Sequence, residues 1–202
     1  MLSLLLIRHG ETDWNREGRV IGWSPVPLNA SGRYQIEQLA ARLKGVRADA
    51  LYASPLQRTI ESAAIIGAAL GLSPIPDDRW IETKITGWEG KLWSELEGHP
   101  IRERYYAAPT ETRLPDGEMF AEVRDRVAAA AAELERRHRN GMIAVVSHAD
   151  PIRAVVGHYI GLELSASHNF RVDHATATIV EIEHGIGTLR VLNAPPDMVR
   201  LP

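Results

Sequence analysis

The feature that most constrains the fold of this chain is a short apolar run near its start that ends abruptly in polar residues. Residues 4–7 (Leu-Leu-Leu-Ile) are followed at once by Arg8, His9 and Gly10. A short apolar run bounded by glycine is typical of a strand that is buried on both faces, as in a parallel sheet. Ligands of open α/β sheets bind at the carboxyl ends of such strands. We therefore expect Arg8 and His9 to face a ligand.

The rest of the chain alternates between strand-like and helix-like segments. Residues 50–54 and 142–146 are two further apolar runs, and apolar residues recur at helical spacing after each of them. This alternation predicts an α/β fold, a three-layer α/β/α sandwich with a mostly parallel central sheet. Gly185 and Gly187 lie between two late strand-like segments and predict a hairpin. Helices are expected to begin with Ser31 as N-cap, at Pro55, at Asp116 or Gly117, and at Pro151.

Composition limits the classes of protein to consider. The 202 residues are enough for one domain, expected over 1–202, with an irregular insertion at about 80–115. The net charge of −3 disfavours nucleic acid or an anionic membrane as the main partner. The chain has no cysteine, which excludes a cysteine nucleophile and cysteine-ligated metals. The leading apolar run is too short for a signal sequence or a membrane span, so we expect a cytoplasmic location.

Three strand–helix junctions carry groups that suit an anion. Arg8 and His9 follow the first strand, Arg58 lies just after the second, and His148 follows the strand at 142–146. If these strands are neighbours, their carboxyl ends meet at one edge of the sheet. Two histidines and two arginines would then converge on one cleft, which supplies locally the positive charge that the whole chain lacks.

A phosphomonoester explains why these residue types occur together. Arginine presents a planar fork of donors that matches phosphoryl oxygens, and helix N-termini add backbone N–H groups. A neutral imidazole can attack phosphorus and form a phosphoenzyme, which divides one difficult step into two. The leaving alkoxide then needs a proton, so a carboxylic acid is expected nearby.

Four ordered motifs resemble those of the histidine phosphatase superfamily, also called the phosphoglycerate mutase-like family. They extend over nearly the whole chain, and their order makes the resemblance specific. The motifs are Arg8-His9-Gly10-Glu11-Thr12 with Asn15, Ser54 with Arg58-Thr59, Trp80-Ile81-Glu82 with Gly87-Trp88-Glu89-Gly90, and Val146-Ser147-His148.

The resemblance implies a role for each matching residue. His9 would be the nucleophile and become phosphohistidine, while Arg8, Arg58 and His148 would hold the phosphoryl oxygens. Glu82 would protonate the leaving group and then activate water. The resemblance also implies one antiparallel edge strand, no cofactor and no metal.

Substrate contacts are expected at positions around these residues. Asn15 would be a further phosphoryl donor. Thr12 is a weaker candidate, because a threonine after a turn is as often a helix cap. The chain departs from the family pattern at Ile21-Gly22, where many members have Gln-Gly, and at Ala149-Asp150, where a glycine usually follows the second histidine. We expect Asp150 to place a carboxylate beside the phosphate cleft, and Ile21, Gly22 and Ala149 to lie where substrate preference is set.

Several alternatives stay open at this stage. Glu89 is the rival of Glu82 as general acid, and His174 could line the pocket, although a surface or core position is favoured for it. A phosphatase acting on a small phosphorylated metabolite is favoured over a mutase because the chain is short. A non-catalytic phosphate-binding protein and a metal-dependent hydrolase are disfavoured. Tryptophans could line the pocket mouth or the face of a homodimer (Trp14, Trp23, Trp88 and Trp93).

Overall fold

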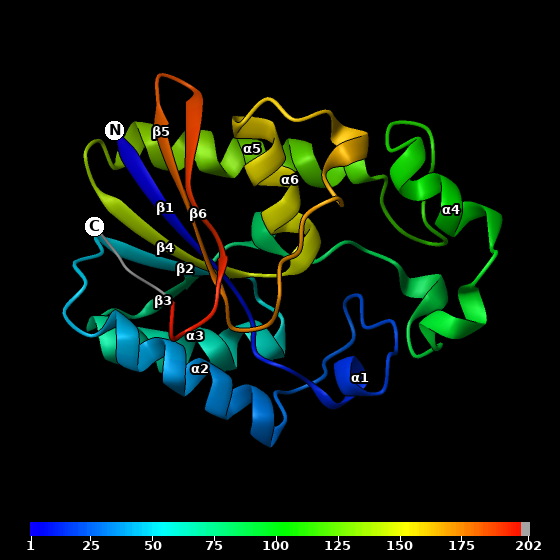
Figure 1. Ribbon diagram of the computed structural model, residues 1–202, viewed down its shortest axis with the longest axis horizontal. Coiled ribbons are helices and arrows are strands. Elements are labelled where there is room, and N and C mark those ends of the chain that lie inside the picture. The colour runs from blue at the N-terminus through cyan, green and yellow to red at the C-terminus, as the bar shows by residue number, and fades with distance from the viewer. Residues whose placement is uncertain (199–202) are drawn as a thin grey trace.

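A six-stranded sheet forms the centre of the molecule in the computed structural model, which describes residues 1–198 (Figure 1). The strand order is β3-β2-β4-β1-β5-β6. The parallel pairs are β1 with β4, β4 with β2, and β2 with β3. The strands are β1 (Leu2–Arg8), β2 (Ala50–Ala53), β3 (Pro74–Pro76), β4 (Met142–Ser147), β5 (Ala177–Glu183) and β6 (Ile186–Ala194).

The two edges of the sheet differ in direction and composition. At one edge, β5 runs antiparallel to β1 and forms a hairpin with β6. The expected hairpin and the antiparallel edge of a mostly parallel sheet are thus confirmed. At the other edge, β3 contains Pro74 and Pro76, which suits a position where one side of the strand needs no ladder hydrogen bonds.

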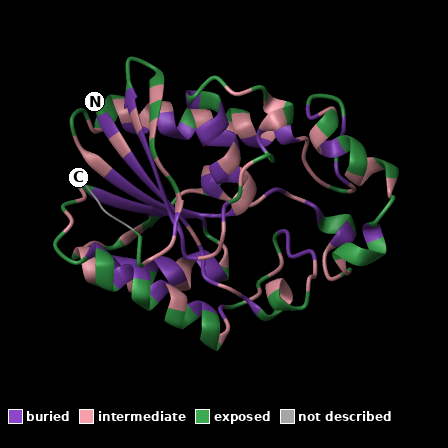
Figure 2. Cartoon of the chain, in the orientation of Figure 1, coloured by how far each residue is buried: buried purple, intermediate pink, exposed green. Residues whose placement is uncertain are grey.

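Helices cover both faces of the sheet, as the three-layer prediction requires. On one face lie α2 (Ala30–Leu43) and α3 (Gln57–Leu70), and on the other lie α5 (Phe120–Arg137) and α6 (Ala149–Tyr159). Strand β1 serves both layers because its side chains alternate between faces. The central strands are consequently buried along most of their length (Figure 2).

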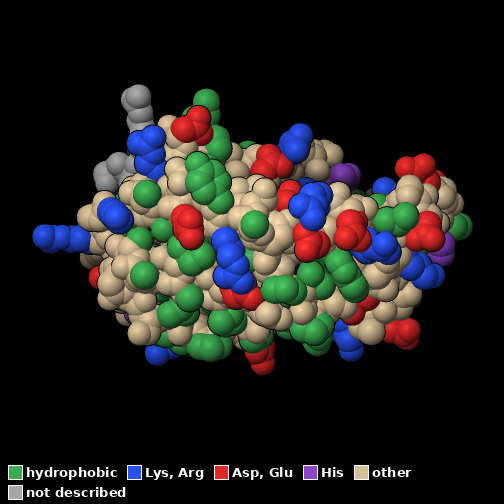
Figure 3. Space-filling model, turned by 90° about the horizontal axis from the view of Figure 1, so that it is seen from below, with side chains coloured by type: hydrophobic (Ala, Val, Ile, Leu, Met, Phe, Trp, Pro, Cys, Tyr) green, Lys and Arg blue, Asp and Glu red, His purple; other side chains and the backbone are tan. Residues whose placement is uncertain are grey.

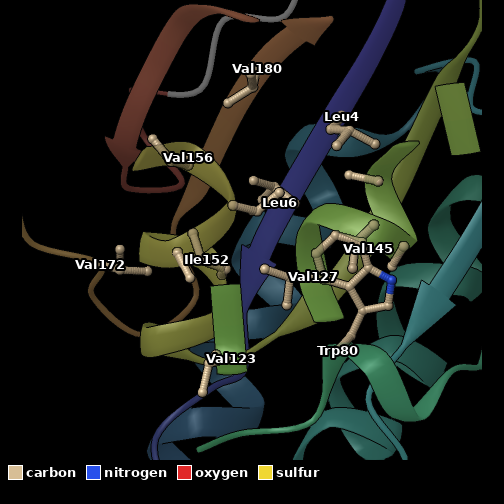
Figure 4. Packing of buried hydrophobic residues seen from close by; sticks show 14 of the residues in the cluster. Leu4, Leu6, Trp80, Val123, Val127, Val145, Ile152, Val156, Val172 and Val180 are labelled. Carbon is tan, nitrogen blue, oxygen red and sulfur yellow. The ribbon is translucent and has the colours of Figure 1, made fainter. Parts of the chain in front are cut away.

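The alternation in β1 divides the apolar core into two clusters. Leu4 and Leu6 pack with side chains of α5 and α6, including Val127 and Ile152 (Figure 4). Leu5 and Ile7 pack instead with residues of α2 and α3. Each full burial of such a side chain contributes about 1.5–3 kcal/mol, so β1 anchors the residues that follow it to both helical layers.

Four helices begin later or earlier than expected, and one of them, α6, begins at Ala149, two residues before Pro151. Helix α2 begins at Ala30, because Asn29 rather than Ser31 is its N-cap and accepts a bond from the Gly32 N–H at 2.8 Å. Helix α3 begins at Gln57, two residues after Pro55. Helix α5 begins at Phe120, since Asp116 has a φ of 48°, a left-handed conformation that belongs to a turn and not to a helix start.

Beyond the carboxyl ends of the strands lies a layer of short elements (Figure 1). It contains α1 (Asp13–Arg16), α4 (Pro100–Ala107) and the 3₁₀ turns Asp78–Trp80, Thr86–Trp88 and Trp93–Leu96. A further 3₁₀ turn, Leu164–Ala166, follows α6. Trp80 is fully buried in the core. The segment at 80–115 is therefore anchored to the core at its start before it extends over the carboxyl ends of the strands.

The surface has charges of both signs. On the face seen in Figure 3, basic and acidic side chains are intermixed rather than gathered into one basic patch. Within residues 1–198 no helix combines the length and apolarity needed to cross a bilayer.

Candidate active site

A cavity of about 390 Å³ opens at the carboxyl ends of the central strands. Its wall is formed by residues from β1, α1, α3, α4 and α6 and from the 80–115 segment. The wall includes most of the residues selected from sequence, namely Arg8, His9, Asn15, Ile21, Gly22, Arg58, Glu82 and Ala149.

His9 is held in one protonation and tautomeric state. Its Nδ1 lies 2.7 Å from the Gly10 carbonyl oxygen, which can only accept, so Nδ1 carries the proton and donates it. The Nε2 atom is left with its lone pair, and the Arg58 Nε–H points at it from 3.3 Å. Burial, followed by the charges of Arg58 and Arg8, holds the pKa of His9 well below its ordinary value. The imidazole is therefore neutral, with a nucleophilic nitrogen beside a cation.

Gly10 allows this arrangement because a side chain would not fit there. A Cβ on Gly10 would collide with the backbone carbonyl of Gly32 at the start of α2. The close approach of the two backbones brings His9 against α3, where the Gly10 N–H donates to the Ser62 hydroxyl at 3.2 Å.

Arg8 and Arg58 are buried cations that are held by backbone carbonyls. Arg58 donates to the Gly22 oxygen at 2.8 Å, and Arg8 donates to the Val172 oxygen at 2.6 Å. Burial lowers the pKa of each to about 10, so both stay charged at neutral pH. Within residues 1–198 neither forms a salt bridge with a carboxylate. Their charge is thus available to an anionic ligand.

His148 lies against His9 from the end of β4. The two ring centroids are 5.1 Å apart. The Nε2 of His148 is 2.8 Å from the Ser54 hydroxyl, whereas its buried Nδ1 has no protein partner. Burial, with the charge of Arg58, holds the pKa of His148 well below its ordinary value. One ring nitrogen of a neutral imidazole is thereby free for a ligand.

Glu82 supplies a carboxyl group that is easily protonated. Burial, and then the negative charge of Asp150, raise the pKa of Glu82 to about 7. The Thr83 N–H, which donates to Glu82 Oε1 at 2.8 Å, and the charges of Arg58 and Arg8 oppose this rise. A group with this pKa can give and take a proton near neutral pH.

Asp150 is the centre of a polar cluster beside Glu82. Its carboxylate accepts bonds from the Thr83 hydroxyl at 3.2 Å, the Tyr106 hydroxyl at 3.2 Å and Arg153 Nη1 at 3.1 Å. The cluster joins α6, the loop that carries Glu82, and α4. The departure from the family pattern at this position therefore places a carboxylate in the cavity wall, as expected.

Four candidates are not part of the cavity wall: His148 and His174, which lie against His9, and Thr12 and Glu89. Thr12 is fully buried and caps α1, where its hydroxyl accepts a bond from the Asn15 N–H at 3.2 Å. Glu89 accepts bonds from the Trp23 N–H at 2.7 Å and the Ser24 hydroxyl at 2.6 Å, so it fixes the loop next to Gly22. Of the two rival acids, only Glu82 lines the cavity.

His174 lies next to His9 but does not line the cavity, so the favoured position away from the pocket wall holds. The centroids of the two rings are 5.5 Å apart, and burial lowers the pKa of His174 to about 3. Its position just before β5, the neighbour of β1, was the available signal. Several cavity residues of the 80–115 segment were not predicted, because no periodic pattern shows how that segment folds back; they include Arg102, Tyr105, Tyr106 and Leu114.

Buried neutral histidines and unpaired arginines at this sheet edge define a site for phosphoryl transfer. Residues 4–195 match the model of the histidine phosphatase superfamily (branch 1), and the chain belongs to that family. It is a phosphatase of this superfamily.

Three similar proteins illustrate the match. Phosphoserine phosphatase 1 of Hydrogenobacter thermophilus is 34% identical over 96% of this chain and 92% of its own length. A protein named "Probable phosphoglycerate mutase GpmB" from Escherichia coli is 31% identical over 92% of this chain and 87% of its own. The solved structure of Bacillus stearothermophilus YhfR superposes with a TM-score of 0.88 at 28% identity, covering 96% of this chain and 98% of that one.

Proposed function

We propose that this protein hydrolyses phosphomonoesters of small metabolites through a phosphohistidine on Nε2 of His9, without a metal or cofactor. The observation that carries the proposal is the tautomer of His9. The Gly10 carbonyl holds the proton on Nδ1, and the lone pair of Nε2 faces Arg58 in the cavity. A nucleophile of this kind needs no prior deprotonation.

In the first step, His9 Nε2 forms a bond to phosphorus while the bond from phosphorus to the ester oxygen breaks. Arg8 and Arg58 neutralise the equatorial oxygens, and the free nitrogen of His148 and the amide of Asn15 can donate to them. Protonated Glu82 gives its proton to the departing oxygen, which leaves as an alcohol.

In the second step, water takes the place of the leaving group. Ionised Glu82 removes a proton from the water as its oxygen bonds to phosphorus and the N–P bond breaks. The products are inorganic phosphate and His9 in its original neutral state. Glu82 is protonated again, so its pKa of about 7 suits both directions of transfer.

The two arginines perform the charge neutralisation for which many phosphatases use a metal. Among residues 1–198 there is no cluster of three or more histidine, aspartate or glutamate side chains placed to hold a metal ion. A cytoplasmic location and a homodimer remain predictions.

Two relatives indicate which substrates and which reaction to consider. The similarity to a phosphoserine phosphatase supports a small phosphorylated metabolite as substrate. The similarity to GpmB keeps a mutase as the second candidate, in which a bound product and not water accepts the phosphoryl group.

The test is phosphate release from a panel of phosphomonoesters with EDTA present, comparing wild type with His9→Ala. The panel includes phosphoserine, phosphoglycerates, sugar phosphates and nucleotides. Release that depends on His9 is expected for at least one compound. Isomerisation of 3-phosphoglycerate without net phosphate release would favour the mutase. No turnover of any compound, together with phosphate binding, would favour a binding protein.

A further inference from the structure

The cavity contains more positive charge than a phosphoryl group requires. Its wall contains two carboxyl groups, Glu82 and Asp150, and five arginines. The arginines are Arg8, Arg19, Arg58, Arg102 and Arg153.

Four of these arginines already have a counterion or a role. Arg19 pairs with Glu17 at 2.6 Å, and Arg153 pairs with Asp150 at 3.1 Å. Arg8 and Arg58, beside His9, match the two negative charges of a phosphomonoester. Arg102 has neither a counterion nor such a role.

Arg102 has no acidic partner in the part of the chain that the structure describes. Its Nη1 donates to the Trp93 carbonyl at 2.9 Å, and its guanidinium lies 5.5 Å from the centroid of the Trp93 ring. These contacts fix the position of the guanidinium and leave its charge uncompensated. The remaining donors of its planar fork are free for a ligand.

Tyr105 provides a second donor on the same face of α4. It lies three residues after Arg102, a spacing that places two side chains together on a helix surface, and both line the cavity. Tyr105 is 3% exposed, and its hydroxyl has the Thr83 side chain as a neighbour but forms no well-aligned hydrogen bond within residues 1–198. Edge-on packing against Tyr106 and Phe120 holds the ring in place. A buried hydroxyl without a partner is costly unless a ligand or water satisfies it.

Given the proposed phosphatase function, we propose that Arg102 and Tyr105 bind a carboxylate on the leaving group, so that the preferred substrate is a phosphorylated hydroxy acid. One cation and one neutral donor match the single charge of a carboxylate, and guanidinium binds carboxylates through paired bonds. A second phosphoryl group would bring about two charges and require a second cation. Apolar residues of the cavity wall, such as Ile85 and Leu114, can pack against the carbon skeleton.

The experiment compares substrates that differ in the carboxylate. The pairs are 3-phosphoglycerate with glycerol 3-phosphate, and 6-phosphogluconate with glucose 6-phosphate. For each pair the ratio of kcat/KM is measured in wild type, Arg102→Met, Tyr105→Phe and the control Arg104→Met. Arg104 lies on the same helix, is 66% exposed and pairs with Glu111 outside the cavity.

We expect wild type and Arg104→Met to prefer the carboxylate in at least one pair by about tenfold or more, the worth of one hydrogen bond to a charged group. Arg102→Met should bring that ratio close to one, mainly through KM. Tyr105→Phe, which removes a single oxygen atom, should lower the ratio several-fold and keeps the test valid if Arg102→Met fails to fold.

Two results would overturn the inference. One is a wild-type ratio near one in both pairs, and the other is an equal loss on both members of a pair in the variants. Turnover of 4-nitrophenyl phosphate that disappears in His9→Ala separates these results from failure of the proposed function. If that turnover is absent, the phosphatase proposal itself fails.

Discussion

Replacing Asp150 by asparagine tests how the site keeps Glu82 protonated. The pKa of Glu82 is about 7, against an ordinary value of 4.5, with burial as the larger cause and the charge of Asp150 as the next. A neighbouring carboxylate typically shifts a pKa by about one unit, which corresponds to ~1.4 kcal/mol. Removing this negative charge makes ionisation of Glu82 easier, so its pKa should fall by about that amount. Asparagine keeps the size of the side chain and an acceptor for Arg153 or Tyr106.

The effect should be confined to the alkaline side of the pH profile. Above the pKa the protonated fraction of Glu82 falls tenfold per unit, so at pH 8 the variant should lose about tenfold in kcat/KM on an alkyl ester. At pH 5.5 both enzymes hold Glu82 mostly protonated, and the rates should nearly agree. The other charged or ionisable groups near Glu82 are the same in both enzymes, namely Arg8, Arg58, Arg126, Arg153, Tyr105 and Tyr106.

The assay is kcat/KM against pH for an alkyl phosphate and for 4-nitrophenyl phosphate, because kcat/KM reports the first step alone, whereas the second step, in which Glu82 is the base, is common to both substrates. The aryl leaving group needs no proton, so its profile should not shift between wild type and Asp150→Asn. Ionisation of the substrate itself is the same for both enzymes and cancels in the comparison. Thr83→Val is the matched control, because it removes one hydrogen bond to Asp150 and keeps the charge. An unmoved alkaline limb in Asp150→Asn, or equal shifts with both substrates, would refute the reasoning.

Three further expectations follow from the same site. Glu82→Gln should lower the rate of phosphoenzyme formation from alkyl esters by about 10²-fold or more but spare that from aryl phosphates, and equal losses of this step in rapid-quench assays would point to another acid such as Glu89. Activity should persist in EDTA, and complete loss that added metal restores would contradict the role given to the arginines. Thr12→Ala should lower the free energy of unfolding in urea by about 1 kcal/mol, since it removes the cap of α1, whereas the exposed Thr110→Ala should change it little.

The sequence was most informative where the fold is periodic. Apolar runs that end in polar residues predicted parallel strands, and neighbouring parallel strands necessarily bring their carboxyl ends together. That topology alone brought Arg8, His9, Arg58 and His148 to one edge of the sheet. Helix starts were less predictable because several nearby residues compete as caps, and Asn29 wins over Ser31 through its bond to the Gly32 N–H.

The positions of Arg102 and Tyr105 in the cavity wall could not be predicted for a different reason. Arg102 and Tyr105 reach the site only because residues 80–115 fold back over the sheet edge, and that path depends on tertiary contacts. Trp80 in the core and the bond from Tyr106 to Asp150 are two such contacts. Neither has a local sequence pattern, so the residues that we propose to select the substrate were invisible from sequence.

Burial sets the protonation state of both the proposed nucleophile and the proposed acid. Burial of His9 keeps its imidazole neutral, and burial of Glu82 keeps its carboxyl protonated near pH 7. Arg8 and Arg58 stay charged in the same place, because the charge of Glu82 opposes the effect of burial on their pKa values, and backbone carbonyls accept their hydrogen bonds. A carboxylate counterion would neutralise these arginines and raise the pKa of His9, which would cost the site both its affinity for phosphate and its nucleophile. The absence of such a counterion among the described residues at Arg8 and Arg58 is thus what allows a phosphoryl group to complete the site.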